Sequence, residues 1–231
     1  MGRSFKTWLA SLALVLASAS CYAQAWTEGK NYFRVDPPQR TSVAPGKVEV
    51  MEVFSYACPA CNRFQPTMQE LKRTLPPNAQ FVYLPASFIA AEDWPVFQRA
   101  YFAADALGIA AKTHDAMFNA IWITGELAVS DPTTGRLKNP LPSINDIARF
   151  YSRTAGVPAD KFLSMAKSFS IDARMKQADA QMGVMQALST PTIIVNGKYR
   201  LDTTSAGGTY DKLVQLVKFL VAKESGPNSG K

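Results

Sequence analysis

The chain has 231 residues, of which 47% are apolar and 11% aromatic, so it can bury a large core without the disulfides that very small domains need. Its formal net charge of +7 comes from lysines and arginines interspersed with acidic residues, and no basic run suggests a nucleic-acid surface. Composition therefore excludes a disulfide-stapled miniprotein and gives no support to nucleic-acid binding.

The first 25 residues have the pattern of a secretory signal peptide. Arg3 and Lys6 precede an apolar run, residues 8–17, that is too short to span a membrane as a helix. Small residues follow, and cleavage after Ala23 or after Ala25 satisfies the small-residue rule. We expect the segment to be removed and the mature protein to be exported.

Cys21 lies inside this segment, so the mature chain would keep two cysteines, Cys58 and Cys61. The alternative is that Cys21 is a lipid attachment site, although residues 18–20 lack the aliphatic residue usual before a lipidated cysteine. No later segment has the apolar length of a membrane span.

Residues 26–90 are predicted to form the first part of an α/β fold. Val48 to Phe54 is β-branched and apolar, as expected of a strand buried on both faces. Cys58 stands where a helix should begin, because Pro59 suits the first helical turn. The predicted helix continues with apolar residues at helical spacing, namely Phe64, Met68, Leu71 and Leu75. A second strand is predicted at Phe81 to Leu84.

Residues 91–186 are predicted to form an inserted all-helical domain. Aromatic and aliphatic residues recur there at helical spacing, and the Gly- and Pro-rich loop Thr124 to Pro142 interrupts them. Strand signals return at Thr192 to Val195, so the helices lie between two parts of one sheet.

Residues 187–224 are predicted to complete that sheet. Asn196-Gly197 is a strong signal for a tight hairpin into Lys198 to Leu201. An amphipathic helix follows from Tyr210, and residues 225–231 are expected to be disordered.

The two cysteines of the CPAC motif allow three interpretations. A metal site is disfavoured because zinc takes three or four protein ligands, and the chain has one histidine, His114, which we expect at the surface or at a helix start. A structural disulfide closing so small a loop would remove little unfolded-state entropy. A reactive dithiol fits better, because a helix N-terminus lowers the pKa of the Cys58 thiol and leaves Cys61 shielded one turn further on.

Glu52 is expected on the same strand face as Val48, Val50 and Phe54, directed at an apolar interior. Desolvation there would raise its pKa toward neutrality and make it a proton relay to Cys61. The alternative is a partly exposed or salt-bridged glutamate.

Thr190-Pro191 precedes the strand at Thr192. A proline at a strand entry loses a hydrogen-bond donor, and a cis bond there would leave the backbone of Thr190 free to pair with an extended peptide. Considered alone, the segment could equally be a loop ending.

Together, the strand-CPAC-helix, the late Thr190-Pro191 with TIIVNGKYRL, and the helices between them resemble the DsbA family of periplasmic thiol:disulfide oxidoreductases. The resemblance covers nearly the whole mature chain. It implies a thioredoxin fold with an inserted helical domain, and no cofactor beyond the redox-active disulfide.

The resemblance also implies roles for individual residues. Cys58 would be the attacking thiol, Cys61 the resolving thiol, Pro191 the cis-proline beside Thr190, and Glu52 the buried acid. The disulfide would pass to unfolded exported proteins with free cysteines. A DsbB-like membrane protein that reduces quinone would regenerate it, and the protein would act as a monomer.

Several positions depart from the family pattern. The dipeptide between the cysteines is Pro59-Ala60 where Pro-His is best known, so one donor to the thiolate is absent. Tyr83 stands where many relatives have a lysine beside the buried acid, and Thr190 replaces a common aliphatic residue. Two other functions stay open, a reductase or isomerase on the same fold and a secreted binding module with a structural disulfide.

Overall fold

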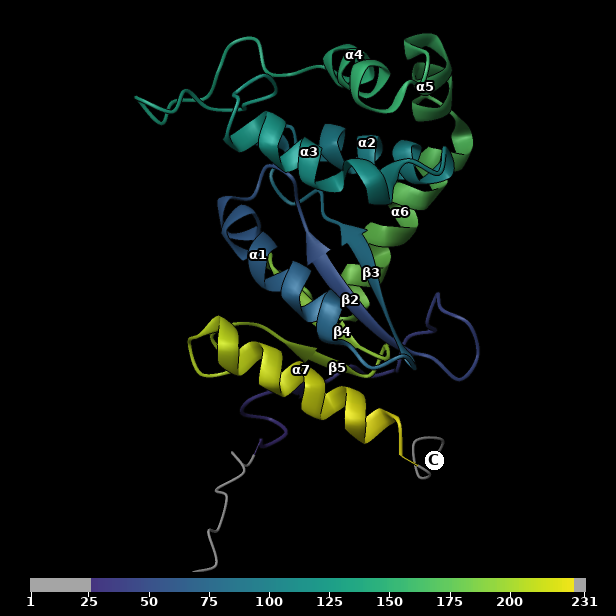
Figure 1. The fold of residues 1–231 in the computed structure, drawn as a ribbon, viewed down its shortest axis with the longest axis vertical. Coiled ribbons are helices and arrows are strands. Elements are labelled where there is room, and N and C mark those ends of the chain that lie inside the picture. The colour runs from purple at the N-terminus through teal and green to yellow at the C-terminus, as the bar shows by residue number, and fades with distance from the viewer. Residues whose placement is uncertain (1–25, 227–231) are drawn as a thin grey trace, which may run out of the picture.

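The computed structural model describes residues 26–226, so the predicted signal peptide, the Cys21 alternative and the last five residues lie outside it. A five-stranded mixed sheet has the strand order β1-β5-β4-β2-β3 (Figure 1). Its strands are β1 Phe33–Arg34, β2 Val48–Phe54, β3 Ala79–Pro85, β4 Thr192–Val195 and β5 Tyr199–Leu201. The pair β2 and β3 is parallel, and the other pairs are antiparallel.

The strand β2 lies second from one edge of the sheet and is buried along all seven residues. Its predicted bounds are confirmed, because a run of β-branched and apolar residues suits a strand covered on both faces. The strand β3 extends beyond the predicted Phe81 to Leu84 at both ends. Its pairing with β2 runs from Val48 beside Ala79 to Phe54 beside Pro85.

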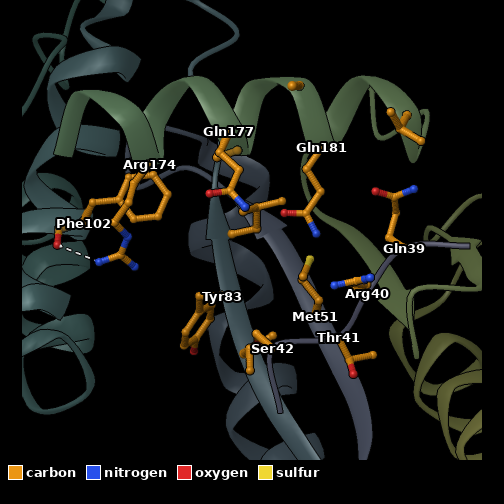
Figure 2. Close-up of a pocket in the computed structure, with 15 residues that line it drawn as sticks. Gln39, Arg40, Thr41, Ser42, Met51, Tyr83, Phe102, Arg174, Gln177 and Gln181 are labelled. Carbon is orange, nitrogen blue, oxygen red and sulfur yellow. Dashed lines mark hydrogen bonds between the residues drawn. The ribbon is translucent and has the colours of Figure 1, made fainter. Parts of the chain in front are cut away.

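Helices cover both faces of the sheet. The helices α1 Pro59–Thr74 and α7 Tyr210–Glu224 share one buried cluster with Val48 and Val50 of β2. The helix α6 Phe169–Val184 lies on the opposite face, where Figure 2 shows Gln177 and Gln181 above Met51. The open cleft between α6 and the sheet contains neither cysteine.

The remaining helices form the predicted insertion between β3 and β4. They are the short helix η1 Ala90–Glu92 and the α-helices α2 Trp94–Ala106, α3 Ala110–Trp122, α4 Ile144–Ala155 and α5 Ala159–Ala166, followed by α6. The insertion does not have a separate core, because its buried residues form one cluster with Met51, Val53 and Ile194 of the sheet. The predicted α/β fold with inserted helices is confirmed.

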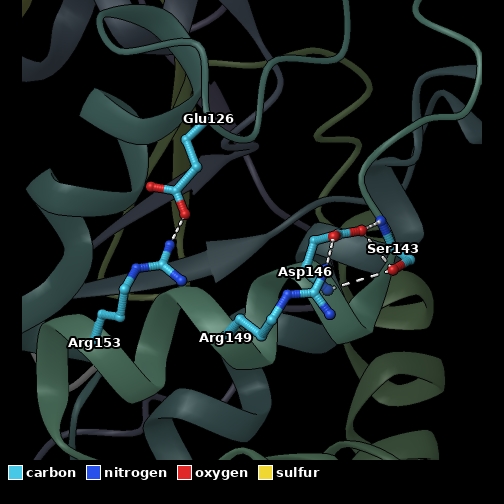
Figure 3. Close-up of polar contacts among 5 residues, drawn as sticks. All are labelled: Glu126, Ser143, Asp146, Arg149 and Arg153. Atoms are coloured by element: carbon cyan, nitrogen blue, oxygen red, sulfur yellow. Dashed lines mark hydrogen bonds and ion pairs between the residues drawn. The ribbon is translucent and has the colours of Figure 1, made fainter.

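The loop Thr124 to Pro142 contains no helix but is held to α4 at both ends (Figure 3). Near its start, Glu126 forms an ion pair with Arg153. Directly after it, Ser143 caps α4 by accepting a hydrogen bond from the backbone N–H of Asp146, and the Asp146 carboxylate accepts in return from the Ser143 backbone. The ion pair thus joins the start of the loop to α4, and the capping box sets where α4 begins.

The hairpin between β4 and β5 turns at Asn196 and Gly197, as predicted. Both residues have positive φ, 54° and 65°, which the tight turn requires. Gly197 also packs against the chain, because a Cβ there would lie 2.1 Å from the carbonyl oxygen of Gln39. Among the helices of residues 26–226, none is long and apolar enough to cross a membrane.

Candidate active site

Cys58 occupies the N-cap of α1, where Pro59 is the first helical residue, as predicted. Its backbone is extended, with φ −82° and ψ 117°, and its carbonyl accepts the first helical hydrogen bond from Asn62 at 3.1 Å. The backbone N–H of Cys61 donates to the Sγ of Cys58 over 3.3 Å. A sulfur at this position therefore receives the kind of bond that a capping oxygen normally accepts.

The residues before Cys58 are fixed from two sides. The Ser55 hydroxyl oxygen accepts from the backbone N–H of Ala57 at 3.2 Å, and the Ser55 carbonyl accepts from that of Cys58 at 3.1 Å. From the insertion, the Trp122 indole N–H donates to the carbonyl of Tyr56 at 2.8 Å. The cysteine thus stands on a turn that both the sheet and α3 hold in place.

The environment of Cys58 favours its thiolate and lowers the pKa of the thiol to about 6. The largest cause is a hydrogen bond from the Cys61 side chain, and burial opposes it. The Thr190 side chain and the backbone N–H groups of Cys61 and Ala60 add further hydrogen bonds. Ala60 contributes through its backbone alone, since its side chain has no donor.

Cys61 lies beneath Cys58 and is fully buried. Burial is the first cause that raises its pKa well above the ordinary thiol value, and the Cys58 and Glu52 side chains raise it further. Both cysteines are present as free thiols. The pair thus consists of one acidic thiol near the surface and one protected thiol that needs a base before it can react.

Thr190 and Pro191 face the cysteine pair from the other end of the chain. The bond between them is cis. The Cys58 thiol lies 3.6 Å from the Thr190 carbonyl oxygen, to which it can donate. Strand pairing explains the meeting, because Val53 near the end of β2 is the register partner of Thr192 at the start of β4.

Glu52 is fully buried on β2, and neither carboxylate oxygen has a hydrogen-bond partner among the described residues. Burial raises its pKa to about 8, the Lys72 ammonium opposes this, and the Cys58 thiolate adds to it. Glu52 is buried as predicted, and the alternative of a partly exposed or salt-bridged glutamate is excluded, since neither carboxylate oxygen has a partner among the described residues. Tyr83 of β3 is its register partner, as the family comparison predicted.

The prediction that His114 lies at the surface or at a helix start is wrong, because it is buried in the second turn of α3. His114 is 2% exposed, shares a hydrogen bond of 3.0 Å with the Tyr56 hydroxyl, and stacks on the Tyr83 ring with centroids 4.0 Å apart. Burial lowers its pKa to about 3, so it is neutral. The sequence did contain a signal for this burial, because His114 shares the helical spacing of Met117, Phe118 and Ile121, which are all buried.

Within the part of the chain that the structure describes, no three His, Cys, Asp or Glu side chains gather as a metal site would require.

An acidic thiol at a helix start, a buried second thiol and a facing cis-proline on a thioredoxin-like sheet define a thiol:disulfide oxidoreductase. A family profile described as Thioredoxin matches residues 44–218. The thiol:disulfide interchange protein DsbA of Pseudomonas aeruginosa is 34% identical over 218 residues, which are 92% of this chain and 95% of that protein. DsbA of Burkholderia cepacia is 32% identical over 221 residues, 94% and 97% of the two chains.

Solved structures agree with these sequence matches. The crystal structure of Pseudomonas aeruginosa DsbA aligns with a TM-score of 0.71 at 35% identity, covering 86% of this chain and 94% of that one. DsbA from Xylella fastidiosa aligns with a TM-score of 0.72 at 31% identity, covering 85% and 96%. The chain belongs to the DsbA family. It is a thiol:disulfide oxidoreductase that acts in oxidative protein folding through its own cysteines, which confirms the predicted fold class, enzyme class and family.

Proposed function

We propose that the Cys58–Cys61 disulfide is donated to exported polypeptides that carry free cysteines. A substrate thiolate attacks the Sγ of Cys58, and Cys61 leaves. A second substrate thiol then attacks the mixed disulfide and expels Cys58 as a thiolate. The observation that carries this proposal is the position of Cys58 at the N-cap of α1, where the backbone N–H of Cys61 donates to its sulfur. These contacts lower the pKa of Cys58, and a stable thiolate is a good leaving group and favours the reduced enzyme.

Glu52 handles the proton of Cys61 in this scheme. Because its pKa is raised to about 8, both the protonated and the ionised form of Glu52 are populated near neutral pH, which suits a group that must both give and take a proton. Cys61 receives a proton when it leaves as a thiolate and loses one when it attacks the mixed disulfide during reoxidation. Both events occur in a buried site where water is scarce.

Thr190 and Pro191 would hold the substrate beside Cys58. Their backbone lies at the start of β4, where an extended polypeptide could pair with it. Leu188, which is 79% exposed directly before this loop, offers an apolar surface for a partly unfolded chain. Between the two cysteines, Pro59 is exposed and Ala60 is half-buried, so the surface that a substrate would meet beside Cys58 is small and apolar.

Family membership supports a proposed cellular setting. We propose that the protein acts in the periplasm as a monomer, after removal of residues 1–25. A DsbB-like membrane protein that passes electrons to quinone would reoxidise it. No nucleic acid, metal or other cofactor enters the scheme.

The test is to trap the mixed disulfide. Cys61→Ser should accumulate covalent complexes with exported proteins in cells that lack their own oxidase, and reducing agent should release them. The control Cys58→Ser keeps one thiol but should trap nothing, because Cys61 is buried. Complexes in neither variant would refute the proposal. A redox potential as low as that of a reductant would instead favour the reductase or isomerase.

A further inference from the structure

Lys72 lies on the same helix as the two cysteines and reaches the strand pair that holds Glu52. It follows Cys61 by eleven residues, so the α-helical repeat of about 3.6 residues per turn brings it back to nearly the same face. Its Nζ lies 4.4 Å from the centroid of the Tyr83 ring and 5.2 Å from that of Phe81. The half-buried ammonium is therefore held over β3.

Tyr83 connects this cation with the buried acid. Glu52 and Tyr83 are register partners in a parallel pair, so their side chains lie next to each other on one face of the sheet. The Lys72 ammonium is thus one aromatic ring away from a carboxyl group that has no hydrogen-bond partner among the described residues.

Lys72 supplies a positive charge that acts on Glu52. The titratable groups that interact with the Glu52 charge are Cys58, Cys61 and Lys72 from α1 and its N-cap, Tyr83 from β3 and Tyr101 from α2. From α3, His114 stacks on the Tyr83 ring, and Asp115 acts on Lys72 and Tyr83. His114 is neutral because burial lowers its pKa to about 3. The Lys72 charge lowers the pKa of Glu52. Burial lowers the pKa of Lys72, and the charges of Glu52 and Asp115 oppose that shift.

We propose that Lys72 is a positioning residue for the redox reaction, whose ammonium stabilises the Glu52 carboxylate across the Tyr83 ring so that Glu52 can accept the proton of Cys61. The inference rests on the proposed role of Glu52 and assigns it a partner on α1. An opposite charge nearby shifts a carboxyl pKa by about one unit or more. Without Lys72, the fraction of Glu52 ionised at neutral pH should fall about tenfold.

Oxidation of the reduced protein by oxidised glutathione separates the step that needs Glu52 from the step that does not. First, the Cys58 thiolate attacks the glutathione disulfide, forms a mixed disulfide and releases one glutathione thiolate. Second, Cys61 gives its proton to Glu52 and attacks the Sγ of Cys58, forming the Cys58–Cys61 bond and releasing the other glutathione as a thiolate. Acid quenching and mass spectrometry resolve the three protein species in a single turnover.

Lys72→Met keeps the length of the side chain and removes its charge. We expect the second step to slow about tenfold at neutral pH and its rate–pH curve to move up by about one unit, with the first step changed less than about twofold. Lys72→Arg should restore the second step. Lys112→Met, at an exposed lysine of α3, should leave both steps as in the wild type.

A Glu52→Gln background decides whether Lys72 acts through Glu52. In it, Lys72→Met should slow the second step no further, and an equal additional loss would overturn the proposal. A rate–pH curve of Lys72→Met that coincides with that of the wild type would also overturn the proposal. If Lys72→Met does not fold, Lys72→Gln can replace it, and NMR titration of the Glu52 carboxyl carbon measures the pKa of Glu52 in that variant. A Glu52 pKa equal to that of the wild type overturns the proposal. A Cys61→Ser protein that forms no mixed disulfide with glutathione would instead refute the proposed function itself.

Discussion

The sulfur of Cys58 lies 3.6 Å from the carbonyl oxygen of Thr190, which is 132 positions later in the chain. The antiparallel pairing of β2 with β4 creates this proximity, since Cys58 follows the end of one strand and Thr190 precedes the start of the other. The backbone that could hold a substrate and the sulfur that would react with it are therefore positioned by the same sheet. Changes at Thr190 should alter the chemistry of the thiol as well as substrate contact.

The acidity of Cys58 can be measured directly. We expect the ultraviolet absorbance of the reduced protein to report one thiolate with a pKa of about 6, and no second thiolate until well above the ordinary thiol range. Cys61→Ala should raise the pKa of Cys58, because it removes the hydrogen bond that contributes most to the shift. Cys61→Ser keeps a donor and should raise it less. A wild-type Cys58 that titrates near 8.5 would contradict the proposed chemistry.

The two redox forms should differ in stability in a pH-dependent way. The folded pKa of Cys58 is lowered, so the stabilisation of the dithiol form is fully present above the unfolded pKa of about 9 and is lost as pH falls through about 6. At pH 7 the effect is on the order of 1 kcal/mol. Urea unfolding of both forms across this range should show that the dithiol form gains stability relative to the disulfide form as the pH rises from about 6 to about 9. A constant difference would count against the shift.

The scaffold of the site could be predicted because its signals are local. A buried apolar strand, a proline at the first position of a helix and an Asn-Gly turn each depend on a few neighbouring residues, and β2, α1 and the hairpin at Asn196 appear where expected.

The environment of Glu52 depends instead on which elements pack together. Sequence reasoning identified Tyr83 as its neighbour but expected His114 at the surface and overlooked Lys72. Both residues contact Tyr83, the neighbour of the acid, through the packing of α1 and α3 near β3, which no local pattern specifies. The helical repeat from Cys61 to Lys72 was a usable signal, but it required knowing that this face of α1 covers Glu52.

Thr190 should tune the thiol through its hydroxyl group. Thr190→Val removes a hydrogen bond to the Cys58 thiolate while keeping the branched shape, and we expect the pKa of Cys58 to rise by about one unit. The disulfide should become a weaker oxidant, because the reduced form loses stabilisation. Thr190→Ser keeps the hydroxyl and should retain the wild-type pKa. Equal shifts in both variants would mean that loop geometry, rather than the hydroxyl, controls the thiol.

Glu52 should destabilise the folded protein at neutral pH. Its pKa is raised from 4.5 to about 8 by burial, so folding is not penalised below pH 4.5 and the penalty grows as pH rises toward 8. Glu52→Gln should therefore stabilise the protein at pH 7, by up to about 3 kcal/mol, and lose that advantage near pH 4. Urea unfolding of the disulfide form at both pH values measures the difference. In this form the cysteines do not titrate, so they do not contribute to the pH dependence.

Glu49 on the same strand provides the matched control. It is 1% exposed, but one of its carboxylate oxygens accepts hydrogen bonds from the backbone N–H and the hydroxyl of Ser42, at 2.7 and 2.6 Å. Glu49→Gln weakens bonds to a charged acceptor, so it should lower the free energy of unfolding at pH 7 by about 1–2 kcal/mol. Opposite signs at two buried glutamates three positions apart would separate the cost of an unpartnered acid from a general effect of changing β2. If Glu52→Gln is destabilising at neutral pH as well, ionised Glu52 does not cost the folded state free energy there, which contradicts a pKa raised to about 8.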